Sequence, residues 1–147
     1  MNVERTIDLA CGPAQAFEHF TAGINAWWPL RAGFSFGADR CDSIHLEAHV
    51  GGRFYERFVD GDELSVGTVT VIDPPHRLVF TWEPPVWSGA TVVEVRFTDN
   101  GDGTTTVHVE HRGFEALGDA GPATRDGFAS GWQTVLAAYA TYVRSAG

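Results

Sequence analysis

The stretch 126-DGFASGWQTVLAAYATYV-143 decides the fold, because its large apolar side chains recur at helical spacing. At about 100° per residue they fall within an arc of about 120° on one side of a helix, and the polar side chains point elsewhere. The side chains on this arc are those of Phe128, Trp132, Val135, Leu136, Tyr139, Tyr142 and Val143. The pattern predicts a long amphipathic helix whose aromatic stripe is covered by another layer of the protein.

Two glycines, Gly127 and Gly131, flank this stripe at a spacing of four residues. A glycine inside a helix destabilises it by about 0.5 to 1 kcal/mol relative to alanine. We therefore expect the helix to lie so close to another element that the contact offsets this loss.

The layer that covers the stripe is predicted to be an antiparallel sheet. Val3, Ile7 and Leu9 alternate with polar residues in a first strand, and Gly12-Pro13 ends it and begins a helix. Further strands are predicted at 44–49, 53–59, 64–72, 77–82, 91–98 and 104–111, with turn signals at 50–52, 60–62, 73–75 and 99–103. Such short turns produce a meander, and one terminal helix covers its inner face. The chain 1–147 is expected to form a single domain.

Several segments, in this order, resemble a known family. They are 50-VGGRFYE-56, 67-GTV-69, 73-DPP-75, 77-RLVFTW-82, the run from Gly103-Thr104 to His111, and 131-GW-132. Together they resemble the domains related to the activator of Hsp90 ATPase, within the START and Bet v 1-like (SRPBCC) superfamily. The resemblance implies an α+β helix-grip fold. In that fold a bent antiparallel sheet of about seven strands wraps around a long C-terminal helix, two short helices follow the first strand, and a cavity is usually enclosed.

The same resemblance leaves the function open. The eukaryotic co-chaperone resembles this chain only in its C-terminal part and carries a further N-terminal domain. Stimulation of Hsp90 therefore does not follow from the resemblance, and a chaperone stays an alternative partner.

The charge and composition exclude several classes of protein. Nineteen acidic residues against ten basic ones give a net charge of -9, which disfavours nucleic acid and anionic membranes as partners. All the basic residues are arginine, which excludes a Schiff-base lysine and indicates a G+C-rich, bacterial coding bias. Cys11 and Cys41 form no CxxC pair and are expected to be reduced thiols, although a disulfide between them stays open. With no leader sequence and no long apolar run, a cytoplasmic protein is expected.

Strand alternation predicts which side chains face the helix. Phe54, Glu56 and Phe58 share one face of their strand, which places Glu56 between two inward aromatic residues. The inward sets in the later strands are Leu78, Phe80 and Trp82, then Val93, Val95 and Phe97, then Val107, Val109 and His111. Burial among aromatic residues raises the pKa of a carboxyl group unless a donor or cation meets it. Glu56 is therefore either bonded to a backbone group or an arginine, or it is a polar ligand anchor.

His111 has the same two interpretations, as a satisfied core histidine or as a functional group. Glu56 and His111 form the only acid and base pair that the sequence offers for catalysis. Metal binding is not expected. His45 and His49 lie about 13 Å apart on a strand, and His108 points away from His111.

The tryptophans suggest a cavity mouth. Adjacent residues of a helix diverge by about 100°, so only one of Trp27 and Trp28 is expected fully inside, with its neighbour at the rim. Trp87, in a proline-rich loop, is expected to be exposed, which favours a binding role.

A large dry cavity is too costly to remain empty. At about 24 cal/mol per Å³, an empty cavity of about 300 Å³ costs on the order of 7 kcal/mol, which rivals the stability of such a domain. Aromatic side chains, a ligand, or polar groups that hold water must fill it. The polar groups available are Glu56, His111, Tyr139 and Tyr142.

The leading hypothesis is a domain that binds a small apolar or aromatic molecule between Trp132, Tyr139 and the inner sheet, without a cofactor or metal. The predicted ligand-binding residues are Trp28, Phe54, Glu56, Phe58, Phe80, Trp82, His111, Trp132, Leu136 and Tyr139. The alternatives are a protein-interaction module that docks a chaperone through its acidic surface, and a lyase, cyclase or hydrolase that uses the same cavity. Either a monomer or a homodimer fits these functions.

Overall fold

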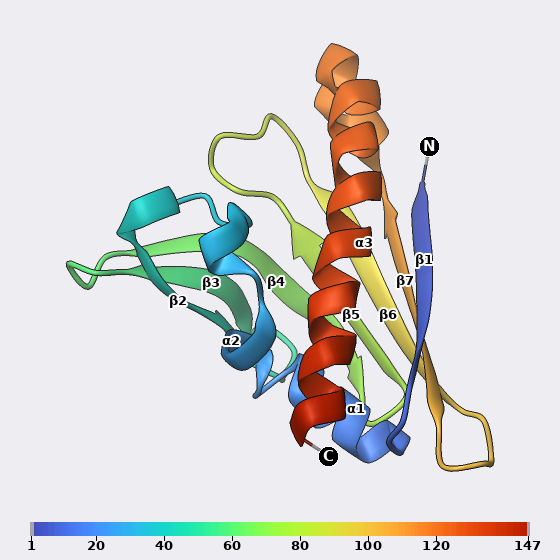
Figure 1. Cartoon of the computed structure of the whole chain (residues 1–147). Coiled ribbons are helices and arrows are strands. Elements are labelled where there is room, and N and C mark those ends of the chain that lie inside the picture. Colours follow the sequence, from blue (N-terminus) through green and yellow to red (C-terminus); the bar gives the residue numbers. More distant parts are fainter. Residues whose placement is uncertain (1, 147) are drawn as a thin grey trace.

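The computed structural model describes residues 2–146, which form a curved sheet with a long helix across its concave face (Figure 1). The strands are β1 (Val3–Leu9), β2 (Cys41–Leu46), β3 (Arg53–Phe58), β4 (Glu63–Asp73), β5 (Arg77–Trp82), β6 (Thr91–Asp99) and β7 (Thr105–Arg112). The helices are α1 (Pro13–Phe20), α2 (Ile24–Trp27) and α3 (Gly121–Ala146), with the short 3₁₀ helices η1 (Leu30–Ala32), η2 (Ala38–Arg40) and η3 (Phe114–Ala120).

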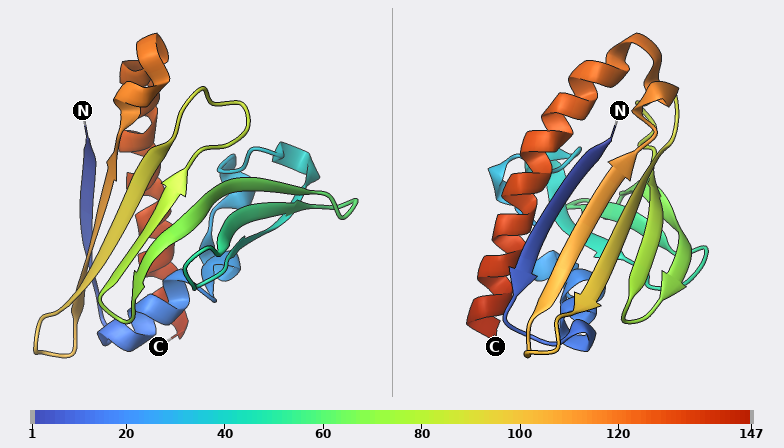
Figure 2. Two further views of the ribbon diagram at one scale, coloured as in Figure 1. Left: turned by 180° about the vertical axis from the view of Figure 1, so that it is seen from behind. Right: turned by 90° about the vertical axis from the view of Figure 1, so that its right-hand side faces the viewer.

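The sheet has the order β1-β7-β6-β5-β4-β3-β2, and all its neighbours are antiparallel. The last strand, β7, therefore pairs with the first strand, β1, and strands β2 to β7 form the predicted meander. Viewed from the side, α3 runs along one face of the sheet, and α1 lies near the C-terminal end of α3 (Figure 2). The predicted α+β helix-grip fold is confirmed, with its two short helices after the first strand.

Two predicted boundaries were wrong. The second strand was expected at 44–49 but is β2 (Cys41–Leu46), because the chain turns after it. In that turn the amide of His49 bonds the carbonyl of Glu47, and the amide of Gly52 bonds the carbonyl of His49. The last helix begins at Gly121, earlier than the apolar stripe indicated.

A glycine allows two strands of the sheet to approach closely. The strand β4 pairs with β3 through Gly67 and with β5 through Val69 onward, and the ladder shifts register close to this point. A Cβ atom on Gly67 would lie 1.6 Å from the carbonyl oxygen of Thr81. Only glycine can occupy this position, where β4 passes directly against the backbone at the end of β5.

The predicted faces of the strands are confirmed. Phe54, Phe80, Val95 and Val109 are buried on the concave side, beneath α3. Trp132 of α3 is 2% exposed, so the aromatic stripe of the helix faces the sheet as expected.

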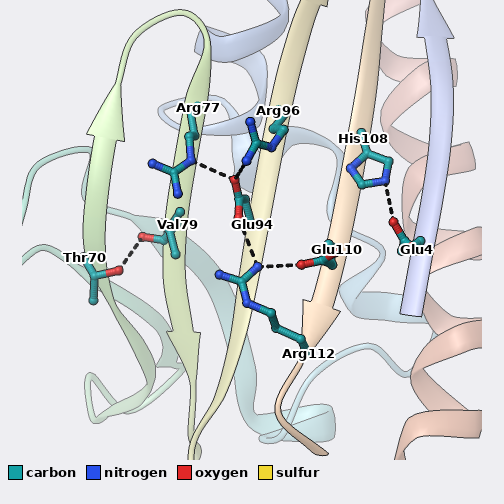
Figure 3. Close-up of polar contacts among 9 residues, drawn as sticks. All are labelled: Glu4, Thr70, Arg77, Val79, Glu94, Arg96, His108, Glu110 and Arg112. Atoms are coloured by element: carbon teal, nitrogen blue, oxygen red, sulfur yellow. Dashed lines mark hydrogen bonds and ion pairs between the residues drawn. The ribbon is translucent and has the colours of Figure 1, made fainter. Parts of the chain in front are cut away.

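The convex face carries a cluster of ion pairs around Glu94 (Figure 3). Its carboxylate meets Arg77 at 2.7 Å, Arg96 at 2.6 Å and Arg112 at 3.0 Å. Burial alone would raise the pKa of Glu94, but hydrogen bonds from Arg77 and Arg112 and the charge of Arg96 outweigh it and lower the pKa. These charges lie on the side of the sheet opposite α3, and they take no part in the interior.

The C-terminal half of α3 is tightly packed. The ring of Tyr139 lies 5.4 Å from that of Phe20 in α1 and 4.6 Å from that of Trp27 in α2. The Tyr139 hydroxyl donates a hydrogen bond to the carbonyl of Ala16, and burial raises its pKa far above the usual value. The two short helices therefore fill the concave face at this end.

Candidate functional site

A cavity of about 410 Å³ lies beside the N-terminal half of α3. It is enclosed by α3, by strands β2 to β5, by the segment 33–36 and by the loop between β5 and β6. Its lining consists of Trp28, Gly33, Phe34, Ser35, Phe36, Ile44, Phe54, Glu56, Val66, Trp82, Trp87, Thr124, Gly127, Phe128, Gly131, Trp132 and Val135. Eight of these residues are aromatic, so the walls offer flat apolar surfaces and few partners for water.

The aromatic walls meet at steep angles. The ring of Trp132 lies 6.0 Å from that of Trp28 at 88°, and 6.0 Å from that of Trp82 at 68°. Phe54 stands 5.3 Å from Trp82 at 57°. The two contacts of Trp132 are edge-to-face and that of Phe54 is tilted, so these rings pack against one another as one continuous aromatic wall of the cavity.

Glu56 on β3 is the one ionisable side chain of this lining among residues 2–146. It is 1% exposed, and its carboxylate accepts hydrogen bonds from the amide of Phe36 at 2.7 Å and from the amide of Gly37 at 3.0 Å. This matches the interpretation of Glu56 as a carboxylate bonded to backbone groups. Its two bonds fasten the segment 33–37 across the cavity.

The ring of Phe58 packs against the segment 33–37 at Gly37. A Cβ atom on Gly37 would lie 2.4 Å from the Phe58 ring, so the glycine allows the backbone to rest directly on it. The Arg40 guanidinium lies over this ring, 4.6 Å from its centre. Phe58 thus supports the wall and is not among the residues that line the cavity.

His111 is buried behind the aromatic wall and does not line the cavity. The indole N–H of Trp132 donates to Nδ1 of His111 at 3.0 Å, so Nε2 carries the proton and donates to the Thr91 hydroxyl at 2.7 Å. Thr91 in turn donates to the carbonyl of Trp82 at 2.9 Å. Burial lowers the pKa of His111 to about 3, which keeps the ring neutral.

Both nitrogens of His111 are therefore occupied, as expected of a satisfied core histidine. The structure does not bring Glu56 and His111 together in the cavity, so the acid and base pair that the sequence offered loses its geometric basis.

The two adjacent tryptophans are both buried, which corrects the expectation that one lies at the rim. The helix α2 ends at Trp27, and Trp28 has an extended backbone with φ of -59° and ψ of 127°. The helical angle between neighbours therefore does not apply. The indole N–H of Trp27 donates to the carbonyl of His19 at 2.7 Å, and that of Trp28 donates to the carbonyl of Phe34 at 2.8 Å.

Trp87 was expected to be exposed but is half-buried, with its ring 5.6 Å from that of Phe128. It forms part of the cavity wall contributed by the loop between β5 and β6. Trp82, in another wall, has a buried indole N–H without a hydrogen-bond partner among the described residues. Such an orphaned donor is costly in an apolar interior.

The glycines Gly127 and Gly131 do not allow a close contact between the helix and another element, which corrects the expectation drawn from their spacing. A Cβ atom on Gly127 would meet nothing within 4 Å, and one on Gly131 would meet only the Phe34 ring at 3.4 Å. Both glycines line the cavity.

A protein-family model matches residues 10–144 of the chain, and it describes the Activator of Hsp90 ATPase homolog 1-like proteins. The chain belongs to this family. None of the curated proteins matches it in sequence.

Solved structures place this family member among helix-grip proteins. Protein MLL2253 from Mesorhizobium loti is similar at 18% identity, with 100% of this chain and 99% of that chain covered and a TM-score of 0.73. An anthrahydroquino-gamma-pyrone synthase, Txn09, is 32% identical, with 82% of this chain and 81% of that chain covered and a TM-score of 0.58. An HSP90 activator from Plasmodium falciparum is 24% identical, with 76% of this chain and 72% of that chain covered and a TM-score of 0.56.

In this family member, the predicted site residues divide into two groups. Five of them line the cavity, namely Trp28, Phe54, Glu56, Trp82 and Trp132. Another five lie outside its lining, namely Phe58, Phe80, His111, Leu136 and Tyr139. Tyr142, proposed as a polar lining group, instead packs on His19 with ring centres 5.3 Å apart.

Sequence reasoning missed the segment 33–36 and the first turns of α3. The segment forms no regular helix or strand, and its position depends on the hydrogen bonds that the amides of Phe36 and Gly37 donate to Glu56. Thr124, Phe128 and Val135 could have been found, because residues spaced by three, four and seven share a side of a helix with Gly131.

Thiol and metal chemistry find no support among the described residues. Both cysteines are free and buried. Burial, followed by the neighbouring charge of Glu56, raises the pKa of Cys41 to about 11, so its thiol is unreactive. No group of three or more potential metal ligands occurs within residues 2–146, and no helix there is long and apolar enough to cross a membrane.

Proposed function

We propose that this protein binds a small, flat, mainly apolar aromatic molecule in the cavity beside residues 124–135. The observation that carries the proposal is the space of about 410 Å³ walled by eight aromatic residues. If dry and empty, a void of this size would cost about 10 kcal/mol, and water inside it finds few hydrogen-bond partners. An aromatic ligand replaces that poorly bound water with ring contacts.

Polar groups of the lining define where the ligand would carry its own polar atoms, and they include Glu56, Trp82 and the Ser35 hydroxyl, which is buried without a partner among the described residues. The Glu56 carboxylate accepts from the amides of Phe36 and Gly37 and meets the Cys41 thiol, and a carboxylate has about four acceptor positions. A ligand hydroxyl group can donate to a remaining one. The indole N–H of Trp82, which has no partner among the described residues, is a donor that suits a carbonyl oxygen. The chemistry of the walls therefore favours a hydroxylated aromatic compound with a carbonyl group.

The likeness to the synthase Txn09 supports the same class of ligand. Its name describes a product with an anthrahydroquinone and a pyrone ring, and it shares 32% identity with this chain. The Plasmodium activator, at 24% identity, supports the fold only. The acidic surface remains the sole support for a chaperone partner.

The proposal is tested by titrating the protein with 1,8-dihydroxyanthraquinone and 1-naphthol, with palmitate as an apolar compound without rings. Binding should quench tryptophan fluorescence, because Trp28, Trp82, Trp87 and Trp132 line the cavity. Native mass spectrometry should show one bound molecule, and the ligand should raise the Tm. Absence of binding by both aromatic compounds would contradict the proposal.

A matched pair of substitutions locates the binding. Thr124→Phe places a ring in the cavity lining, whereas Thr141→Phe makes the same change on the exposed side of the same helix. We expect at least tenfold weaker binding for Thr124→Phe and unchanged binding for Thr141→Phe. Equal effects of the two would place the ligand elsewhere.

The likeness to Txn09 favours one second candidate, a ring-closing enzyme that uses the same cavity. Glu56 is then the proton acceptor, as the one ionisable side chain of the lining in the described chain. The test incubates the protein with hydroxyanthraquinones that carry a reactive side chain beside the hydroxyl group, and it follows absorbance for a product of unchanged mass. Glu56→Gln should abolish turnover while the ligand still binds, although more weakly, because the glutamine side chain can accept from only one of the amides of Phe36 and Gly37 with its single oxygen. Turnover that persists in Glu56→Gln would remove Glu56 from this role.

A further inference from the structure

Gly127 and Gly131 occupy α3 without a structural need for glycine. At three other positions the need is plain. A Cβ atom on Gly67 would lie 1.6 Å from a carbonyl oxygen, one on Gly52 2.2 Å and one on Gly89 2.5 Å. At Gly127 the same atom would meet nothing, and at Gly131 it would only touch the Phe34 ring. Neither helix glycine has a positive φ angle.

These two glycines lower the stability of the helix, and no close contact with another element offsets the loss. Alanine in a helix interior is more stable than glycine, because glycine loses more backbone freedom on folding. Both positions line the cavity, with Gly127 exposed at its mouth and Gly131 half-buried deeper inside. Because neither residue has a side chain, the cavity extends up to the backbone of the helix at these two positions.

We propose that Gly127 and Gly131 set the size of the ligand, by leaving one wall of the cavity flat enough for a fused ring system to lie against it. This inference rests on the proposed function. A cavity of about 410 Å³ lies within the range of about 300 to 1,000 Å³ that is usual for small-molecule sites, near its lower end. The volume on the helix side therefore matters for the size of the ring system that fits. Methyl groups at both positions narrow the space from the helix side.

The experiment compares Gly127→Ala, Gly131→Ala and the double variant with the unchanged protein. The probes are 1,8-dihydroxyanthraquinone, with three fused rings, and 1-naphthol, with two. Ser130→Ala is the matched control, because it also raises helix propensity, and Ser130 is exposed and absent from the cavity lining. Affinity is measured by fluorescence quenching, and stability by the Tm without ligand.

We expect the double variant to bind the three-ring probe at least tenfold more weakly and 1-naphthol within about twofold of the unchanged protein, with each alanine raising the Tm. Ser130→Ala should raise the Tm and leave both affinities unchanged. If the double variant binds the three-ring probe as tightly as the unchanged protein does, the inference is wrong and the proposed function stands. If the alanines lower the Tm, the glycines serve the packing and the inference is also wrong. If neither probe binds the unchanged protein, the proposed function and the inference are both wrong.

Discussion

The two halves of α3 lie against the same concave sheet, yet one half is packed and the other borders a cavity. At the packed half, Tyr139 meets aromatic rings from α1 and α2. At the hollow half, Trp132 faces a space covered by the segment 33–36 and the loop between β5 and β6. Both halves carry aromatic side chains, so aromatic content does not decide which one is hollow. The cover decides it, because α1 and α2 pack Phe20 and Trp27 directly against Tyr139, whereas the segment 33–36 and the loop between β5 and β6 leave a cavity between their side chains and α3.

Polar groups differ between the two halves in the same way. At the packed half, the Tyr139 hydroxyl is bonded to the Ala16 carbonyl. Within residues 2–146, the buried side-chain polar atoms without a hydrogen-bond partner are the Ser35 hydroxyl and the indole N–H of Trp82, and both residues line the cavity of the hollow half. Unused hydrogen-bonding groups beside an aromatic cavity indicate a surface arranged for a guest molecule.

The largest expected effect concerns the packed half. Phe20→Ala should lower the free energy of unfolding by about 3 to 5 kcal/mol, because Phe20 is fully buried among the rings of Trp27, Phe97 and Tyr139. The matched change in the hollow half is Phe36→Ala. Phe36 is 38% exposed, and we expect a loss below about 1 kcal/mol.

Urea unfolding of both variants measures this difference. Losses of similar size for Phe20→Ala and Phe36→Ala would show that the segment 33–36 is as much a part of the core as α1 is, and the contrast between the two halves would fail.

The free energy of unfolding is expected to depend on pH through His111, which is buried behind the aromatic wall of the cavity. In the folded protein burial lowers the pKa of His111 to about 3, compared with 6.5 for an unperturbed histidine. Below pH 6.5 the unfolded chain binds a proton that the folded protein does not, so stability is complete above pH 6.5 and falls as the pH decreases toward 3. At about 1.4 kcal/mol per pH unit, the loss at pH 5 is about 2 kcal/mol.

The control for this effect is His111→Gln, whose amide can accept from Trp132 and donate to Thr91 but does not titrate. The free energy of unfolding is measured between pH 4.5 and 7.5 for both proteins. His45 also has a lowered pKa because of burial, but it contributes equally to both slopes. Identical slopes would mean that the His111 ring is protonated within the fold, and the closed hydrogen-bond chain through Thr91 would be wrong.

The fold could be predicted because its signals are local. The alternation of residues 91–98 and the helical spacing of 126–143 depend only on neighbours in sequence, and both correctly identified the inward faces. The resemblance to the family added the bend and the two short helices. The second strand was misplaced because turn hydrogen bonds at His49 and Gly52 override an apolar pattern that continues past Leu46.

The site could be predicted only in part, for a physical reason. Alternation placed Glu56 inward, but its partners are amides 19 and 20 residues away in a segment without regular structure. Whether an inward residue borders space or packing depends on what covers it. Trp132 and Tyr139 have the same sequence signal, and only the positions of α1, α2 and the loops separate them.

The smallest expected effect on stability lies at the cavity mouth. Trp87→Ala should lower the free energy of unfolding by only about 0.5 to 1 kcal/mol, because Trp87 is half-buried and its one aromatic neighbour is Phe128. It should nevertheless weaken binding of 1,8-dihydroxyanthraquinone several-fold, since it removes one wall of the cavity. Val86→Ala on the same loop is the control, because Val86 is 81% exposed and absent from the lining. Titration and urea unfolding of both variants separate the two effects: a large loss of stability in Trp87→Ala would assign the loop to the core, and unchanged affinity would place the ligand away from it.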